Sequence, residues 1–425
     1  MSGPDSGEVS GSGSAKGSAL GDELTVAGFG VLGTWAWFLY GFGAILPLLR
    51  DEEGISRSVL GLHSLALAAG GAVSGVLAVP LTRALRRRGT FVVAVVLVCI
   101  GVPLLVVLHA PALTIAAAGI VGTGGSMLVN SAVPALSDHH DGGAASVISL
   151  ANGFAAGVGL LAPSAIGLTV GLGWTWRPAA LLTVPLALGV LVLVRRVPRG
   201  TPAMDGTPGS AAAAGGPLPA AARVFLLLVV LCVGIEFCCT AWAADLLHQR
   251  TGLSTGTASS GVTAVVGGMA VGRVALGRLA LRYTSQRLLL IALGVTGAGW
   301  LLTWVPTHPA LVLAGLVLTG LGIAAHYPLG ASLLYAAAPG QADRATGRLS
   351  LGIAVAAGGA PFALGAVADA TSTHTAFLAV PLLVVAGLAA LTASRRFDSP
   401  QRPAPELLAG HRPQARPGPL PDLPA

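Results

Sequence analysis

Long hydrophobic stretches follow one another along most of the chain, separated by short segments that contain arginine, glycine or proline. Residues 89–137 and 288–342 contain no Asp, Glu, Lys or Arg, and each stretch is interrupted near its middle by a short segment with proline. A helix needs about 20 apolar residues to cross the hydrocarbon core of a bilayer. Each of these stretches therefore predicts two membrane-spanning helices joined by a hairpin.

The same rule, applied to the whole chain, predicts an all-α integral membrane protein with twelve spanning helices. The predicted spans are 26–49, 58–81, 90–108, 112–136, 144–170, 178–194, 224–247, 257–280, 288–305, 310–336, 348–368 and 375–394.

Composition supports a membrane protein and excludes most soluble classes. Hydrophobic residues make up 54% of the chain and charged residues 10%, whereas soluble domains carry about 25% charged residues. Such a chain cannot cover a water-exposed surface with polar groups. Soluble enzymes, nucleic-acid-binding proteins and disordered chains are therefore excluded.

The basic residues indicate topology, because Lys and Arg are retained on the cytoplasmic side of a membrane. Twenty of the 24 lie on one side of the predicted bundle. That side holds Lys16 and the arginine clusters at 83–88, 195–223, 273–287, 344–348 and 395–416, and the other side holds Arg50, Arg57, Arg177 and Arg250. The net charge of +7 is therefore interpreted as a sign of membrane topology. The one-sided distribution of Lys and Arg predicts a multi-pass protein of the inner (plasma) membrane with both termini in the cytoplasm. One lysine against 23 arginines is typical of a GC-rich bacterial genome.

An internal repeat appears when the chain is compared with itself at an offset of 198 residues. Pro111 then meets Pro309, and Ala162-Pro163-x-x-x-Gly167 meets Ala360-Pro361-x-x-x-Gly365. The repeat predicts two parallel six-helix halves. The predicted division is a disordered cytoplasmic tail over 1–25, a first half over 26–194, a cytoplasmic linker over 195–223, a second half over 224–394 and a Pro-rich cytoplasmic tail over 395–425.

The eighth predicted span ends in Gly272-Arg273-x-x-x-Gly277-Arg278-Leu279. With twelve spans, two repeated halves and a central cytoplasmic linker, this motif resembles the major facilitator superfamily (MFS) of secondary transporters. The resemblance covers about residues 26 to 394. It implies a single-chain monomer that moves a small-molecule substrate through the lipid bilayer by alternating access.

Conformational gating is expected from charged residues and glycines at the cytoplasmic ends of the spans. The loop over 75–88 lacks the acid that the family usually places before its arginines. We therefore expect the charge pairing to be weakened, or to be relocated to Asp343 and Arg344 or to Asp138 and Asp141. The residues expected to take part in gating are Gly272, Arg273, Gly277, Arg278, Arg83, Asp343 and Arg344.

Glu236 is the candidate for proton coupling. It lies twelve residues into the seventh span, which places it about 18 Å along the helix and close to the bilayer midplane. A charge there costs at least about 2.5 to 3.5 kcal/mol. Glu236 is therefore either a protonatable group that faces the transport cavity or a neutral side chain bonded to a neighbouring helix.

The other candidate site residues lie on the helices that line the cavity in the family. His326, midway along the tenth span, is expected to be a proton or substrate ligand with Glu236, or a hydrogen-bonded packing histidine. The expected substrate-binding residues are Trp35, Trp37, Tyr40, Asn130, Glu236, His326 and Tyr327. The two tryptophans lie about 200° apart on a helical wheel, so at most one faces the cavity fully.

The chain contains no motif for bound nucleotide, cofactor or catalysis. Its only lysine, Lys16, is not part of a phosphate-binding loop, so the energy source is expected to be a proton gradient and not ATP. His139 and His140, flanked by Asp138 and Asp141, are interpreted as a solvated polar turn, with a metal site as the alternative. We expect no enzyme activity, cofactor, metal or nucleic-acid partner.

These features predict a proton-coupled secondary transporter. Efflux of an amphipathic or cationic compound fits the single intramembrane carboxylate and the aromatic residues. Uptake of a small polar metabolite, such as a sugar or organic acid, fits the poor match to the family's antiporter signature. In the fifth span only Pro163 and Gly167 agree with that signature. A membrane sensor that does not transport is a further alternative.

Overall fold

The computed structural model describes residues 22–394 except 141–143, 206–216, 281 and 340, and all regular structure in these residues is α-helical. The helices are α1 (Glu23–Glu53), α2 (Arg57–Val107), α3 (Pro111–His139), α4 (Ala144–Gly171), α5 (Arg177–Leu181), α6 (Thr183–Arg196), α7 (Pro202–Asp205), α8 (Ala220–Thr251), α9 (Thr255–Ala258), α10 (Ser260–Leu279), α11 (Ser285–Trp304), α12 (Pro309–Ile323), α13 (His326–Ala336), α14 (Ala342–Ala370), α15 (Thr373–Ala376) and α16 (Ala379–Ser394).

Twelve helical stretches in the described residues are long and apolar enough to cross a membrane, which confirms the predicted number of spans and the all-α fold. Most boundaries agree within a few residues. The second and third spans are numbered together as α2, but they are two helices that meet within the predicted gap between 81 and 90. The chain turns at Arg86, whose φ of 59° and ψ of 170° are non-helical. One residue in this conformation is enough to separate the two helices.

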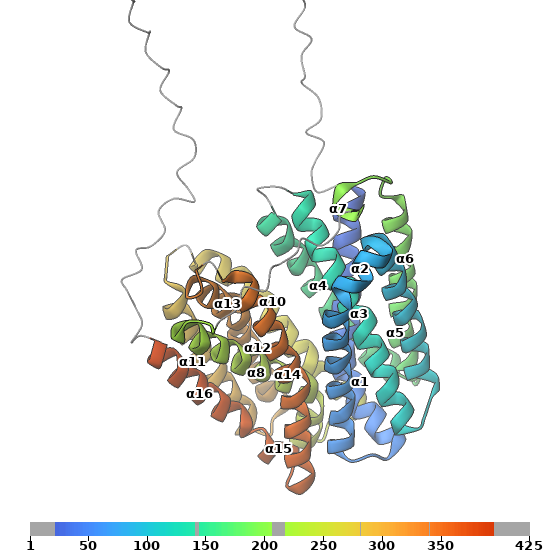
Figure 1. Ribbon diagram of the computed structural model, residues 1–425. Helices are drawn as coiled ribbons and strands as arrows, with labels where there is room; N and C mark the ends of the chain where they lie inside the picture. Colours follow the sequence, from blue (N-terminus) through green and yellow to red (C-terminus); the bar gives the residue numbers. More distant parts are fainter. Residues whose placement is uncertain (1–21, 141–143, 206–216, 281, 340, 395–425) are drawn as a thin grey trace, which may run out of the picture.

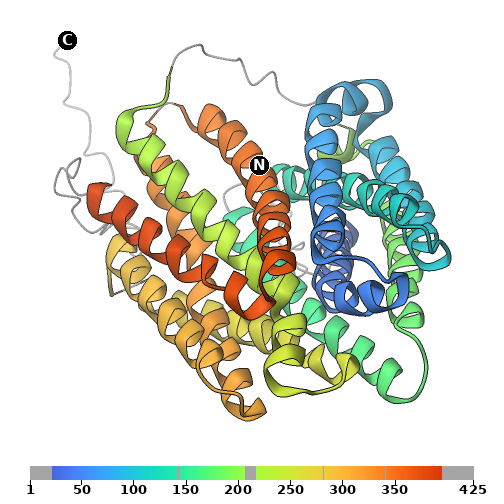
Figure 2. The same cartoon turned by 90° about the horizontal axis from the view of Figure 1, so that it is seen from below.

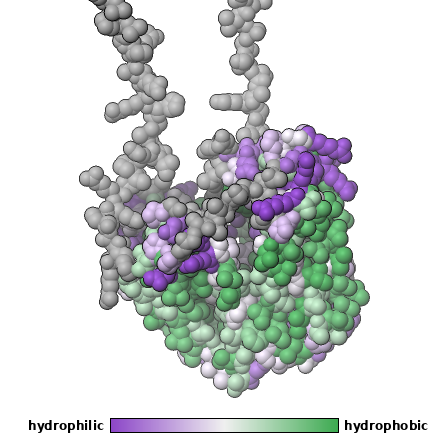
Figure 3. Space-filling model, in the orientation of Figure 1, coloured by the Kyte–Doolittle hydropathy of each residue, from purple (hydrophilic) through white to green (hydrophobic). Residues whose placement is uncertain are grey.

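The helices form two bundles that lie side by side (Figures 1 and 2). α1 to α6 pack against one another, and α8 to α16 form the second bundle. Between the bundles, α1 packs against α8, α2 against α14, and α4 against α10. Hydrophobic side chains cover the visible flank of the molecule and hydrophilic ones gather mainly at its upper end (Figure 3). This distribution is the one a bilayer requires of an embedded helical protein.

The two bundles meet closely at the end where α1 terminates, which we call the Asp245 end. Here a β-carbon on Gly43 of α1 would lie 2.3 Å from the carbonyl oxygen of Thr240 in α8. A β-carbon on Gly61 of α2 would likewise lie 2.8 Å from the Cα of Phe362 in α14. Because the backbones approach this closely, the end is shut.

The opposite end, where α1 begins and the arginine clusters lie, is open between the bundles. A β-carbon on Gly153 or Gly157 of α4 would meet no atom within 4 Å, and the same holds for Gly277 of α10 and Gly347 of α14. Phe154, which lies on α4 with Gly153 and Gly157, is 48% exposed. Gly153 and Gly157 therefore do not form a close helix crossing in this conformation.

The start of the predicted linker packs onto the first bundle. Met204 of α7 is buried, and the backbone carbonyl of Ala203 accepts a hydrogen bond from Arg87 at 2.5 Å. Arg88 donates to the carbonyls of Val194 and Val197 at 3.0 and 2.8 Å. The arginines of α2 thus hold this part of the linker against the arginine-cluster end.

The first helix begins earlier than predicted, at Glu23. Asp22 caps it by accepting a hydrogen bond from the backbone N–H of Thr25 at 2.6 Å. Partial burial acts to raise the pKa of Asp22, but hydrogen bonds from Thr25 and His139 outweigh burial and hold the pKa below its ordinary value. The remainder of the predicted N-terminal tail, and the C-terminal tail over 395–425, lie outside the described residues.

Candidate functional site

Glu236 lies halfway along α8, on the side of the second bundle that faces the first. Its side chain is half-buried, and within the described part of the chain no hydrogen bond or ion pair engages its carboxylate. The cation in its electrostatic surroundings is Arg273 of α10. A carboxylate in this position is available for a proton or for a ligand.

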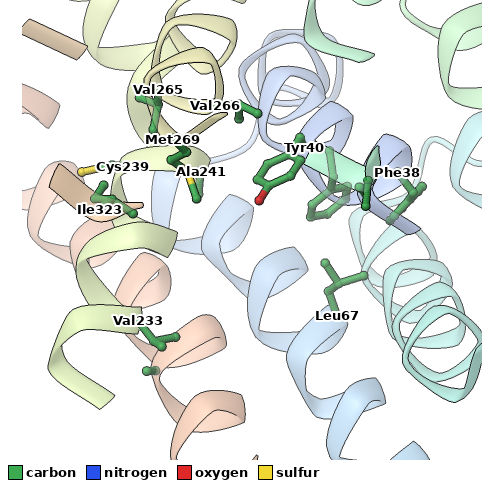
Figure 4. Close-up of a cluster of buried hydrophobic side chains, with 14 of the residues drawn as sticks. Phe38, Tyr40, Leu67, Val233, Cys239, Ala241, Val265, Val266, Met269 and Ile323 are labelled. Carbon is green, nitrogen blue, oxygen red and sulfur yellow. The ribbon is translucent and has the colours of Figure 1, made fainter. Parts of the chain in front are cut away.

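Tyr40 brings the first bundle into the same site. Its ring is buried against α4, where a β-carbon on Gly159 would lie 2.4 Å from the Tyr40 ring. Figure 4 shows the ring extending from α1 toward the second bundle, opposite Val266, Met269 and Ala241. The hydroxyl interacts with the guanidinium group of Arg273 and lies within electrostatic reach of Glu236. Tyr40 therefore connects the charged pair to the first half of the protein.

Arg273 has a different environment from the one expected. It was predicted to take part in gating at the cytoplasmic end, but its half-buried side chain reaches the surroundings of Tyr40 and Glu236. The preceding glycine makes this possible, because a β-carbon on Gly272 would lie 2.6 Å from the carbonyl oxygen of Leu321 in α12. A larger residue at 272 would push α10 away from α12 and displace Arg273.

His326 is turned toward α11. Thr296 donates its hydroxyl hydrogen to the carbonyl of Ala292 at 2.9 Å, so its oxygen accepts a bond from His326 Nε2 at 3.1 Å. The Nδ1 atom is buried with no hydrogen-bond partner in the described chain. Ala324 and Ala325 separate α12 from α13 at this point. Tyr327, which follows His326, is 44% exposed and within electrostatic reach of Glu236.

The remaining predicted ligands pack within the first bundle. Trp37 is buried and donates its indole N–H to the carbonyl of Ala179 in α5 at 3.1 Å. Trp35 lies directly over Gly125 of α3, which has no side chain to obstruct it. Asn130 of α3 is exposed but donates to the hydroxyl of Ser74 in α2 at 3.2 Å, which bridges two helices.

A second polar cluster, which was not predicted from the sequence, joins the bundles at the Asp245 end. Asp245 of α8 is 1% exposed and accepts hydrogen bonds from Arg50 of α1 and from Thr373 of α15. Arg57 of α2 approaches the same carboxylate at 3.4 Å. We call these four residues the Asp245 latch. It pairs a buried acid of the second bundle with two cations of the first.

Two further contacts reinforce the latch. Asp369 of α14 accepts hydrogen bonds from the backbone N–H groups of Arg57 and Ser58 at 2.7 and 2.6 Å, which caps the start of α2. Asp51 of α1 accepts one from the hydroxyl of Thr255 in α9 at 3.0 Å. Acids from both bundles and two arginines of the first bundle thus take part in the contacts at this end.

A family model for the Major Facilitator Superfamily matches residues 26–283 and 224–420. The chain belongs to the Major Facilitator Superfamily. It is a multi-pass membrane protein of a family of secondary transporters, which bind small-molecule substrates. No curated protein matches the chain.

Solved MFS structures share the fold at low sequence identity. A peptide transporter, POT, in complex with alafosfalin has a TM-score of 0.71 at 15% identity, over 88% of this chain and 94% of that one. The nucleoside transporter NupG has a TM-score of 0.67 at 11% identity, over 89% and 99%. The E. coli fucose:proton symporter FucP has 0.60 at 18%, over 87% and 98%. These transporters carry chemically different substrates, so the shared fold does not specify one.

The other expected gating residues of this MFS transporter lie at the arginine-cluster end. Arg83 and Arg278 are exposed, and Arg344 donates to the side chain of Gln341 at 2.8 Å. Asp138 pairs with Arg87 at 2.5 Å, which is a charge pair within the first bundle. The side chain of Asp343, and Asp141, lie outside the described residues.

Proposed function

We propose that this MFS transporter moves a small molecule by alternating access coupled to a proton gradient, and that Glu236 carries the coupling proton. The observation that supports this most directly is the unpartnered, half-buried Glu236 carboxylate between the two bundles. Among the residues that the structure describes, it is the only acid near the middle of a span. Isolated ionisable groups at this depth mark proton or substrate pathways.

Protonation of Glu236 would change the interaction between the bundles. The ionised carboxylate attracts Arg273. Tyr40 of the first bundle interacts electrostatically with both residues. When the carboxylate is neutral, that attraction is lost, and Arg273 keeps its interaction with Tyr40 and becomes available to a ligand. The protonation state therefore biases which end of the transporter opens.

The proposed direction is efflux of an amphipathic or cationic compound. A cation that binds Glu236 competes with the proton there, which is the exchange that a proton antiporter requires. Tyr40, within electrostatic reach of Glu236, extends toward Val266 and Met269 (Figure 4), and a tyrosine ring attracts cations through its π face.

Arg273 favours a second candidate, uptake of a small polar metabolite such as a sugar or an organic acid. A guanidinium group presents paired donors that match a carboxylate, and Arg273 lies beside the phenol hydroxyl of Tyr40. In this case Glu236 would hold the co-transported proton while Arg273 binds the substrate.

The experiment uses purified protein in liposomes that enclose a pH-sensitive dye, with a panel of cationic drugs, sugars and organic acids. Proton flux driven by cationic drugs, and lost when the proton gradient is collapsed, is the result expected for efflux. Flux with sugars or organic acids would instead establish the uptake candidate. Arg273→Gln separates the two, because it should weaken transport of an anion and spare or improve that of a cation.

The membrane orientation and assembly follow as part of the proposal. We propose that the arginine-cluster end faces the cytoplasm, so that both termini are cytoplasmic and the open end is the inward one, in a bacterial inner membrane. The transporter is proposed to act as a monomer, since each chain carries both bundles and the complete site between them.

Gly157→Leu is expected to block transport without unfolding the protein. A β-carbon at Gly157 meets no atom within 4 Å in this conformation, so the leucine fits. Closing the arginine-cluster end would bring this face of α4 against the second bundle, where the added side chain obstructs it. Substrate flux and thermal unfolding are measured together.

Gly189→Leu is the matched control. Gly189 of α6 is also exposed with no atom within 4 Å of its β-carbon position, but α6 makes its contacts with α1, α2 and α5 of the first bundle. The control should transport normally. Normal flux in Gly157→Leu would show that this face of α4 does not close.

A further inference from the structure

Three side chains of metal-ligating types converge at the arginine-cluster end, away from the candidate site around Glu236. Asp22 precedes α1, His139 ends α3, and His140 follows it. One ligand atom of each residue lies within 4.8 Å of the corresponding atoms of the other two. Asp22 and His140 are half-buried and His139 is exposed, so the group is open to ions from the aqueous phase.

The end of α3 allows two consecutive histidines to face one acid. Neighbouring residues on a regular helix point about 100° apart. His140 leaves the helix with a φ of −107° and a ψ of 64°, which turns its ring to the same side as that of His139. The two rings stand 4.9 Å apart, nearly edge to face.

Hydrogen bonds around the start of α1 hold the three ligand atoms near one another. One carboxylate oxygen, Oδ1, caps α1 through the N–H of Thr25, which leaves Oδ2 directed at His139 Nε2. His140 directs its Nε2 at the hydroxyl of Thr25, 2.6 Å away. Both imidazoles therefore present the same nitrogen toward the start of α1.

We infer that Asp22, His139 and His140 bind a divalent transition-metal ion of the zinc type. Two imidazoles and one carboxylate form a known zinc ligand set, which leaves a fourth position for water. Imidazole nitrogen selects zinc, cobalt, nickel or copper over magnesium and calcium, which prefer oxygen ligands. No other group of three His, Cys, Asp or Glu side chains in the described residues lies close enough to hold a metal.

The ion joins the first helix to the end of α3. Next to it, Asp138 is already paired with Arg87, so metal binding would fix the whole segment 138–140 to α1 and α2. This segment leads into α4, the helix with the open face around Gly157. The site thus stabilises the first bundle from the side of the arginine clusters.

The test uses the full-length protein without a histidine tag, stripped of metal and titrated with Zn²⁺ and Co²⁺. We expect one equivalent of Zn²⁺ to bind and to raise the unfolding temperature, and bound Co²⁺ to give visible absorption of a tetrahedral nitrogen and oxygen site. Mg²⁺ at the same concentration should do neither. Equal stabilisation by Mg²⁺, or no Co²⁺ absorption, would overturn the inference.

Three single variants identify the ligands. His139→Gln, His140→Gln and Asp22→Asn should each weaken Zn²⁺ binding by at least about tenfold, since even residues that only orient ligands cost that much. Asparagine caps helices as well as aspartate does, so Asp22→Asn removes the ligand charge and keeps the start of α1. His308→Gln, an exposed histidine before α12, should bind Zn²⁺ normally. Unchanged affinity in the three folded variants would refute the site.

Discussion

Replacing Glu236 with glutamine should abolish proton-coupled flux and leave the fold intact. Glutamine has nearly the same shape as glutamate, and no described side chain depends on the carboxylate for a hydrogen bond or ion pair. It cannot bind and release a proton, so the coupling step is lost. The expected proton flux is that of liposomes without protein, measured with the enclosed dye while substrate is supplied.

Two further variants make this result specific. Glu236→Asp keeps an ionisable group on a shorter side chain and should retain part of the flux with a changed pH dependence. Glu23→Gln is the matched control, because Glu23 is an exposed glutamate in the first turn of α1 and should transport normally. Transport in Glu236→Gln that equals wild type would refute proton coupling through this residue.

The hydrophobic pattern was sufficient for the fold because the bilayer imposes one solution. Every backbone group in the hydrocarbon core must be hydrogen-bonded internally, so each long apolar stretch has to be a helix. The stretches 89–137 and 288–342 accordingly each contain the hairpin expected. The second and third spans likewise separate at Arg86, where the arginines predicted a break. The connection is short, and Arg87 within it bonds to Asp138 and to the carbonyl of Ala203.

The arrangement of the candidate site could be predicted only in part. Glu236 is conspicuous as one acid in a long apolar span, and Tyr40 was proposed from its place in the first span; their roles stay predictions. The rotation of a side chain about its helix is not visible in sequence. His326 therefore turns to Thr296 on α11 and Trp37 to Ala179 on α5, which periodicity alone did not indicate.

The Asp245 latch escaped prediction for a related reason. An acid near the end of a predicted span is usually interpreted as solvated, and the arginines that surround Asp245 come from α1 and α2, almost two hundred residues earlier. A signal was present. Arg50 and Arg57 are two of only four basic residues on their side of the predicted bundle. Because Lys and Arg are retained mainly on the cytoplasmic side, basic residues on the other side are expected to have acidic partners.

Asp245→Asn should shift the transporter away from the conformation described here. The carboxylate is buried between Arg50 and Arg57, and its removal leaves two cations facing each other. Breaking a buried ion pair costs about 3 to 5 kcal/mol. The latch joins the bundles only while this end is shut, so a cost of about 3 kcal/mol lowers the ratio of shut to open molecules by more than about 100-fold.

The shift is measured with a reporter cysteine. Ser259 is buried at the contact between α4 and the second bundle, where a β-carbon on Gly167 would lie 2.6 Å from its hydroxyl. Ser259→Cys changes the side chain little and should react slowly with a membrane-impermeant maleimide. Adding Asp245→Asn should raise that rate strongly. Labelling of the native cysteines is measured in the protein without Ser259→Cys and is subtracted.

The exposure of each acid predicts how much it contributes to the latch. Asp51 also pairs with Arg50, but its side chain is 47% exposed, and exposed pairs contribute only about 0 to 1 kcal/mol. Asp51→Asn should therefore change the labelling rate by less than about sixfold. Arg50→Gln added to Asp245→Asn removes one of the two facing cations and should restore part of the slow labelling. A folded Asp245→Asn protein that labels as slowly as the reporter alone would mean that the close backbone contacts at Gly43 and Gly61, and not the charges, hold this end shut.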